Sequence, residues 1–465
     1  MAVLNAVRMS GREVLPIVEG GKGVSISTGS SSGAWAAAGG IGTVSAVNAD
    51  SYDENGEIIP QVYHARNRRD RHEELVKYGI DGGITQVKRA FDISAGKGAL
   101  HINVLWEMGG AERILHGVLE KTKGLVNGVT CGAGMPYKLA QIAAQYGVHY
   151  YPIVSSGRAF RALWKRAYHK ASDYLGGVVY EDPWRAGGHN GLSNSEDPEK
   201  PEDPYPRVKA LREVMNQAGL QETPIVMAGG VWYLRDFSDW MDNPEIGPIA
   251  FQFGTRPLLT KESEISSEWK EKLLRLVKGD VFLHKFSPTG FYSSAVNNAF
   301  LKDLRGRSER QIAFTLEEIG EHDTVLEYGP RGRKLYVAAK DNIRAKTWME
   351  NGHTEALKTP DNTLVYVSPE QRDEIRKDQR DCMGCLSQCQ FSNWAENEKG
   401  STGRLADPRS FCIQKSLQDI AHGGDTDKNL MFAGHSAFKF GTDPFYSNGF
   451  IPTVRQLVDR IMTGD

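Results

Sequence analysis

Short apolar runs rich in β-branched and aromatic residues recur along the first 260 residues. Each is followed by a glycine, proline or polar break and then by a longer segment of helical character. The predicted strands are 14–18, 42–47, 101–105, 128–131, 149–154, 175–180, 224–228 and 248–253. The helices expected between them are 68–78, 111–121, 137–146, 157–170 and 207–218. Eight strands alternating with helices predict an α/β protein built as a (β/α)8 TIM barrel, although an open doubly wound sheet gives the same alternation.

The alternation ends near residue 280. Beyond it, the pattern predicts a hairpin over 324–338 around a Gly-Pro turn, a charged helix over 370–381 and an amphipathic terminal helix over 452–463. We therefore expect two parts, a barrel domain at 1–300 and a C-terminal, Cys-rich extension at 301–465.

Two further segments have a distinctive composition. The stretch 193–206 holds four prolines and several acidic residues, so we expect an exposed loop after the sixth strand. The segment 434–446 is rich in glycine and aromatic residues, and we expect a structural turn region there rather than a cover over the barrel mouth.

Composition narrows the class of protein. The chain has 465 residues, 40% hydrophobic and 25% charged, with a net charge of −2, which is typical of a globular protein and excludes disorder throughout. The balance of charge gives no overall attraction to nucleic acid or to an anionic membrane, so we expect neither as a partner. Glycine is in excess, with 50 residues, and the clusters fall mainly in the breaks that follow strands.

The N-terminal segment 1–24 has no apolar core followed by a cleavage site, and no later run is long enough to cross a membrane, so we expect a cytoplasmic protein. In that setting, clustered cysteines favour metal ligation over disulfides. Four of the five cysteines cluster near the end of the chain, and Cys131 stands alone. We expect Cys131 to be a small core residue rather than a nucleophile.

Glycines end the seventh and eighth strands, at Gly229-Gly230 and Gly254-Thr255. In a parallel barrel, backbone N–H groups of these two loops can cradle a phosphate, which glycine allows to approach closely. One such glycine motif alone is more often a plain turn. Two motifs in adjacent loops predict phosphate binding.

His189 lies in the run Arg185-Ala-Gly-Gly-His-Asn-Gly191, just past the sixth strand. Glycine neighbours leave the imidazole free to face a ligand, and its ordinary pKa near 6.5 suits proton transfer at neutral pH. A solvent-exposed loop histidine is the alternative.

Five segments, at 16–25, 38–43, 186–189, 228–230 and 251–255, resemble in the same order motifs of the nitronate monooxygenase (2-nitropropane dioxygenase) family. The resemblance implies an FMN-binding barrel with a small-molecule substrate, in which His189 is the active-site histidine. It also implies that Gly20 and Gly21 line the isoalloxazine and that Asn103 contacts the flavin. The other cofactor-binding residues implied are Lys22, Gly188, Gly229, Gly230, Gly254 and Thr255, of which the last four hold the phosphate.

The chain departs from that family in its first loop, where Glu19 and Lys22 replace the usual Gln and Met. This predicts a cation beside the pyrimidine edge of the flavin, a charge that favours the reduced, anionic ring.

The cysteine cluster is Cys382-Met-Gly-Cys385-Leu-Ser-Gln-Cys389, with Cys412 further along the chain. Four such thiolates can hold a zinc ion or an iron–sulfur cluster. The run also resembles the Cys-x-Gly-Cys-x3-Cys segment of iron–sulfur flavoenzymes related to old yellow enzyme, where it follows a flavin barrel and binds [4Fe-4S]. We therefore predict a [4Fe-4S] cluster on these four residues, with zinc or unligated thiols as alternatives.

Together these features predict an FMN-dependent oxidoreductase of the nitronate monooxygenase type, which oxidises nitronates and nitroalkanes with dioxygen. The alternative is an FMN/[4Fe-4S] reductase of a conjugated, enoyl-type C=C bond or a quinone, with NAD(P)H or a redox protein as electron donor. A non-catalytic flavin- or metal-binding regulator is a third interpretation. A homo-oligomer is compatible with each of them.

Overall fold

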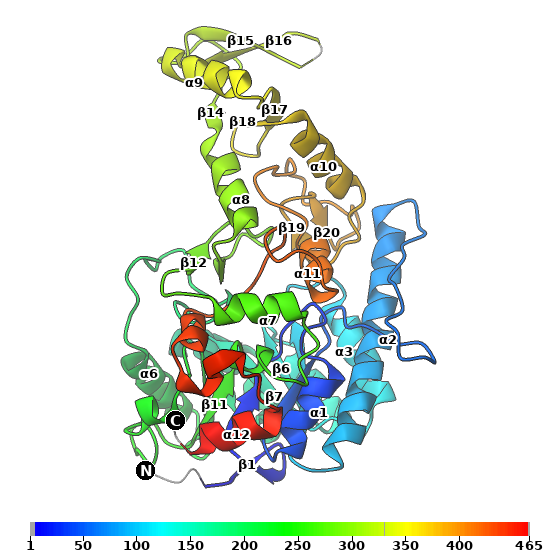
Figure 1. Ribbon diagram of the computed structural model, residues 1–465, viewed down its shortest axis with the longest axis vertical. Coiled ribbons are helices and arrows are strands. Elements are labelled where there is room, and N and C mark those ends of the chain that lie inside the picture. The colour runs from blue at the N-terminus through cyan, green and yellow to red at the C-terminus, as the bar shows by residue number, and fades with distance from the viewer. Residues whose placement is uncertain (1–4, 330, 464–465) are drawn as a thin grey trace.

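Eight parallel strands close into a barrel, which confirms the predicted (β/α)8 fold (Figure 1). The computed structural model describes residues 5–329 and 331–463. Around the barrel the strands follow the order β10-β11-β3-β4-β5-β6-β7-β8. Their bounds are β3 Ile17–Glu19, β4 Ile41–Ser45, β5 Ala99–Leu105, β6 Gly128–Gly132, β7 His149–Val154, β8 Val178–Glu181, β10 Ile225–Ala228 and β11 Ile249–Phe253. Each of the eight predicted runs contains or overlaps one of these strands.

A short hairpin closes the amino-terminal end of the barrel. It consists of β1 (Val7–Met9) and β2 (Arg12–Val14), so the first predicted run spans the end of β2 and the start of β3. Ser10 in its turn hydrogen-bonds His101 Nε2 at 2.8 Å and Tyr151 OH at 2.7 Å inside the barrel. Burial lowers the pKa of His101 to about 3, so the imidazole is neutral there. Because the hairpin covers the amino-terminal end, a ligand can enter only at the carboxyl end of the strands.

Helices surround the barrel and bury its outer face in one large apolar cluster. They are α1 Gly29–Ala37, α2 Arg68–Ser94, α3 Ala111–Lys121, α4 Leu139–Tyr146, α5 Gly157–Arg166 and α6 Pro204–Gln217. Helix α7 (Ser267–Leu274) packs instead in a second apolar cluster, together with buried residues of the segment 431–440. Short 3-10 turns lie at Tyr168–Tyr174, Leu234–Phe237 and Arg256–Leu258. The pattern missed α1, whose nine residues are mostly Gly, Ser and Ala.

Helix α2 continues far past its predicted end at residue 78. The glycines that suggested a break allow it to pack closely, because a Cβ on Gly82 would lie 1.8 Å from the carbonyl oxygen of Ala49. A Cβ on Gly83 would lie 2.6 Å from the side chain of Val118. Tertiary packing therefore outweighs the low helix propensity of glycine here.

The predicted 193–206 loop is shorter than expected. Asp203 accepts a hydrogen bond from Tyr205 N, and Pro204 occupies the first turn, so α6 begins before residue 206.

The extension begins as a small α/β module that projects away from the barrel (Figure 1). It contains a three-stranded sheet, a hairpin and a helix around an apolar cluster of its own. Helix α8 (Ala299–Glu309) leads into this module. The module's own elements are β14 Gln311–Ala313, β15 Thr324–Tyr328, β16 Arg333–Val337, α9 Ala339–Glu350, β17 Glu355–Lys358 and β18 Thr363–Val367. The predicted 324–338 hairpin is present, although Pro330 of its turn lies outside the described residues.

The chain then returns toward the barrel through α10 (Pro369–Arg380), β19 (Gln388–Cys389), β20 (Trp394–Ala395) and α11 (Ile413–Ala421). Helix α12 (Val454–Met462) ends the described chain and buries Val454, Leu457, Val458 and Ile461 in the barrel's outer cluster. Capping boxes begin α10 and α12, near the starts expected for the two predicted helices. The end of the extension is thus part of the barrel's packing.

No helix within 5–329 or 331–463 combines the length and the apolar character needed to cross a bilayer.

Candidate active site

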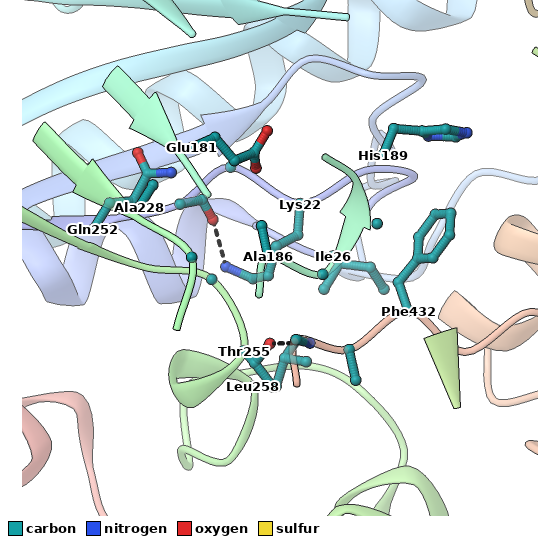
Figure 2. Close-up of a pocket in the computed structure, with 18 of the residues that line it drawn as sticks. Lys22, Ile26, Glu181, Ala186, His189, Ala228, Gln252, Thr255, Leu258 and Phe432 are labelled. Carbon is teal, nitrogen blue, oxygen red and sulfur yellow. Dashed lines mark hydrogen bonds between the residues drawn. The ribbon is translucent and has the colours of Figure 1, made fainter. Parts of the chain in front are cut away.

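A cavity opens at the carboxyl ends of the barrel strands, where a TIM barrel places its active site (Figure 2). All ten residues predicted for the barrel site line it. They are Gly20, Gly21, Lys22, Asn103, Gly188, His189, Gly229, Gly230, Gly254 and Thr255. The extension completes the wall with Leu417, Ile420 and residues 432–434 and 436. The expectation that 434–446 stays away from the mouth is therefore wrong at its first residues.

The glycines give this cavity its shape. Gly229 and Gly230 have φ values of +86° and +79°, a backbone conformation that other residues rarely adopt. A Cβ on Gly21 would lie 2.3 Å from the Cβ of Asn103, so the first loop touches β5 only because it has glycine there. A Cβ on Gly254 would meet no described atom within 4 Å and would occupy open space beside the lining. Such a surface suits a planar or phosphorylated ligand that contacts backbone directly.

Arg185 is a cation beside the predicted phosphate loops that the sequence did not single out. Its Cδ lies 2.9 Å from where a Cβ on Gly230 would stand, and its guanidinium pairs with Asp182 at 3.3 Å. The other lining arginine, Arg256, is buried and lies 3.5 Å from Asp443. A guanidinium next to glycine amides is a typical phosphate partner. The sequence signal for Arg185 was its position in the same glycine-rich run as His189.

Hydrogen bonds connect the extension to Thr255 and to the Gly230 loop at the cavity mouth. The Thr255 hydroxyl accepts a hydrogen bond from Gly434 N at 2.9 Å, and Ser436 Oγ donates to Gly230 O at 3.3 Å (Figure 2 shows the first). The extension is thus fixed to both predicted phosphate loops.

Lys22 is present as expected but is not an isolated cation. Its ammonium lies 3.2 Å from Glu19 Oε1. It also donates a hydrogen bond to Gly20 O at 2.8 Å (Figure 2). Ser31 Oγ also donates to Glu19 Oε1, at 2.5 Å. Burial lowers the pKa of Lys22, while the Glu19 carboxylate acts to raise it. The two departures from the family pattern therefore form one buried ion pair under the first loop.

His189 lies in a strand rather than in a freely projecting loop. It forms β9 (Gly188–His189), which pairs with β13 (Ser293–Val296), and β13 in turn pairs with β12 (Val281–His284). Its Nε2 is 2.7 Å from Ser287 Oγ, and its ring packs edge-to-face on Phe432 at 5.6 Å. Burial lowers the pKa of His189 to about 4, so the imidazole is neutral at physiological pH. It can take up a proton or donate one N–H, but it brings no positive charge.

Glu181 is a lining residue that the sequence analysis missed. It is the last residue of β8, and burial, with a smaller contribution from Asp182, raises its pKa to about 8. An acidic residue at the carboxyl end of a buried parallel strand was the available signal.

The four clustered cysteines come together in the extension. Cys382 and Cys389 are buried in one apolar cluster, and Cys385 and Cys412 pack against it. Burial raises the pKa of Cys385 well above its usual value, and the three neighbouring thiols raise it further. Burial likewise raises the pKa of Cys389 to about 11 and that of Cys412 to about 12. Cys131, by contrast, is buried in β6 within the barrel core, as expected.

Hydrogen-bond donors surround these sulfur atoms. Gly384 N lies 3.4 Å and Ser392 Oγ 3.1 Å from Cys382 Sγ. Backbone amides also face the other three sulfurs: Phe391 and Ser392 at Cys389, Gln414 at Cys385, and Lys415 at Cys412. Donors of this kind stabilise thiolates and tune iron–sulfur centres.

The predicted metal site is nevertheless not confirmed. Within 5–329 and 331–463, no three His, Cys, Asp or Glu side chains are arranged so that they could hold a metal ion. The structure places the four thiols in one apolar cluster, but it does not arrange them as metal ligands.

No protein-family model matches the chain, and no curated protein matches its sequence. Solved structures do share its fold. FabK from Thermotoga maritima matches with a TM-score of 0.51 and 16% identity over 97% of this chain and 92% of that chain. The enoyl reductase domain of MlnA from the macrolactin biosynthesis cluster of Bacillus amyloliquefaciens matches with a TM-score of 0.53 and 12% identity over 97% and 93%. At these identities the likeness shows the barrel fold alone.

Proposed function

We propose that the chain is an FMN-dependent oxidoreductase whose active site is the cavity at the barrel mouth. The observation that carries this proposal is the lining itself. Glycines from the loops after β3, β10 and β11 face one space, and Asn103 and His189 stand on its wall. The site fits FMN because Gly254 leaves room for a ligand and Arg185 supplies a cation beside the Gly230 loop.

The chain's own residues would divide the work of holding the cofactor. Gly229, Gly230, Gly254 and Thr255 would hold the phosphate, with Arg185 balancing part of its charge. Gly20, Gly21 and Asn103 would line the isoalloxazine, and Gly188 would let β9 approach it. The Lys22–Glu19 pair would lie beneath the first loop. Bound FMN would accept and return electrons, singly or in pairs.

We assign nitronate oxidation as the leading activity. A neutral His189 can remove the proton alpha to a nitro group through a ring nitrogen, or donate a hydrogen bond to a nitro oxygen that gains negative charge. The Nε2–Ser287 hydrogen bond holds the ring in place during either step. The products would be a carbonyl compound and nitrite, with dioxygen as the oxidant.

The second candidate is a reductase that acts on an enoyl-type C=C bond or a quinone. It is favoured by the four thiols, which we propose to bind a [4Fe-4S] cluster rather than zinc, because amide and hydroxyl donors face their sulfur atoms. Such a cluster would supply single electrons, delivered by NAD(P)H through a partner or by a redox protein.

Helix α11 connects the two regions. Cys412 caps its N-terminus, and Leu417 and Ile420 on the same helix line the cavity. Five residues of helix span about 8 Å, so a cluster at Cys412 would lie close to the flavin site. The loop after β5 also joins them, since Gly109 N donates to Cys385 O at 2.9 Å.

Two assays on the purified protein separate these activities. The first follows dioxygen uptake and nitrite release with an alkyl nitronate. The second adds a conjugated enoyl compound or a quinone to the dithionite-reduced protein without oxygen and follows flavin reoxidation. Nitrite release supports the leading activity, and reoxidation in the second assay alone supports the reductase. A flavin-loaded protein that does neither with a broad substrate panel contradicts both.

A further inference from the structure

Glu181 lines the cavity from the carboxyl end of β8. It ends β8, and its register partner on β10 is Ala228, which is paired in turn with Gln252 on β11. All three residues line the cavity, and Figure 2 shows the Glu181 side chain on the wall near Gln252. The carboxyl group is thus placed by three adjacent strands rather than by a mobile loop.

The carboxyl group of Glu181 has no hydrogen-bond or ion-pair partner among the described residues. Its neighbour Asp182 accepts hydrogen bonds from Trp184 N at 2.9 Å and Arg185 N at 3.0 Å, besides its pair with the Arg185 side chain. Glu19 below the first loop is likewise paired with Lys22. Of these three acids, Glu181 is the one that lines the cavity, and its carboxyl group is free to meet a ligand there. A half-buried carboxyl group on a cavity wall can hydrogen-bond a ligand that enters the cavity.

The surroundings keep Glu181 protonated at neutral pH. Burial raises its pKa to about 8, and the Asp182 carboxylate adds to the rise. The other titratable lining residues are Lys22, Arg185, His189 and Arg256. Lys22, Arg185 and Arg256 have carboxylate partners of their own, and His189 is neutral. A protonated carboxyl group is a hydrogen-bond donor, which a carboxylate is not.

We propose that Glu181 donates a hydrogen bond to the ring of the bound flavin, and that its ionisation controls how easily the flavin is reduced. This inference rests on the proposed function, because it requires FMN in the cavity. While Glu181 is protonated, its O–H favours electron density on the ring. Once it ionises, a buried negative charge lies beside the ring and opposes reduction. The enzyme would therefore be a better electron acceptor below the pKa of this residue than above it.

The test uses the flavin-loaded protein, with its absorption spectrum and its midpoint potential followed from mildly acidic to alkaline pH. We expect a single spectral transition near pH 8 in the wild type, together with a potential that falls more steeply with pH above the transition than below it. Glu181→Gln keeps the size and a donor group but cannot ionise, so it should lose the transition and have the higher potential at alkaline pH. Glu181→Ala should lack the transition and have a lower potential than Glu181→Gln at every pH.

Two control variants identify the titrating group. Lys22→Met removes the lining ammonium whose pKa burial lowers, and the transition should persist in it. Glu213→Gln changes an exposed glutamate on α6 and should match the wild type. A fully loaded wild type without a transition, or a Glu181→Gln protein that retains it, would overturn the inference. A wild type that binds no flavin would instead refute the proposed function itself.

Discussion

The barrel mouth and the thiol cluster are two candidate redox sites built in opposite ways. The mouth is made by residues without side chains, since glycines from three strand ends leave a space into which a cofactor fits. The thiol cluster is made by side chains that converge, and apolar residues such as Phe391 and Trp394 pack around them. The glycine wall of the mouth is formed by folded backbone of the barrel, and the extension completes it. The thiols, by contrast, become a charged site only when a bound ligand takes the place of their protons.

This difference determines how each site responds to its ligand. FMN would enter a space already bounded by folded backbone, so binding it should require little conformational change. A cluster would have to deprotonate thiols whose pKa values burial has raised, and its binding energy would then stabilise the extension. We therefore expect the barrel to tolerate the loss of its cofactor better than the extension does.

The largest expected effect concerns the thiols. Replacing any one of Cys382, Cys385, Cys389 and Cys412 with Ser removes a soft ligand, and iron and acid-labile sulfide should fall together to near background. Elemental and sulfide analysis of anaerobically purified proteins measures this. Cys131→Ser is the matched control, and iron and flavin should be unchanged in it. One zinc per chain with no sulfide in the wild type would remove the cluster from the account.

The next effect concerns the space beside Gly254. This glycine lacks a positive φ, and a Cβ there meets no described atom within 4 Å, so Gly254→Val should fold normally. Its side chain would occupy the proposed phosphate site, and FMN affinity should fall at least about a hundredfold, or ~2.7 kcal/mol. Titration of the flavin-free protein with FMN gives the number. Gly306→Ala in α8 adds a methyl group outside this site and should bind FMN like the wild type. Equal affinity in both variants would place the phosphate elsewhere.

A third effect is a dependence of stability on pH that belongs to Glu181. The folded pKa of about 8 lies above the unfolded value near 4.3, so the native state binds the extra proton. The protonated carboxyl group therefore contributes to the stability of the native state. Its contribution is complete below the unfolded pKa and is lost as pH rises through the folded pKa. The loss is on the order of a few kcal/mol. Flavin-free Glu181→Gln should therefore gain stability relative to the wild type between about pH 5 and pH 8. Denaturant unfolding at several pH values measures the free energy of unfolding of both proteins. If the difference between the two free energies does not change with pH, the raised pKa is contradicted.

The smallest effect concerns His189. His189→Ala should retain FMN but lose about tenfold in turnover, ~1.4 kcal/mol, the lower side of losses for a general acid or base. His169→Ala, an exposed histidine after α5, is the control and should turn over normally. Because His189 is neutral over the working range, its loss should lower the rate evenly across neutral pH without moving the pH optimum. Full turnover in His189→Ala with every active substrate would reduce this residue to a structural one.

Much of the barrel could be predicted because its periodicity is local. Each buried parallel strand is a short apolar run, and a glycine cluster after it marks the carboxyl end, so Gly20, Gly229 and Gly254 could be assigned to one face before any coordinates. Helix α2 was predicted too short because Gly79, Gly82 and Gly83 look like a break, and only the close approach of Ala49 and Val118 reveals their use.

Other features depend on contacts between distant parts of the chain and leave no local pattern. His189 is fixed by β13, about a hundred residues away, and Thr255 is capped by Gly434 from the extension. Glu181 resembles any acid at a strand end until its neighbours show that it lacks a partner. Cys412 is likewise brought to the three earlier cysteines by the packing of α11, which its distance along the chain does not reveal.

The proposed function requires that the glycine-lined mouth of this barrel binds FMN. The most direct measurement is the identity and amount of flavin released when the purified wild-type protein, reconstituted with both FMN and FAD in excess and then desalted, is denatured and separated by chromatography. We expect one FMN per chain and little FAD. A protein that releases no flavin, or that releases FAD in place of FMN, would contradict it.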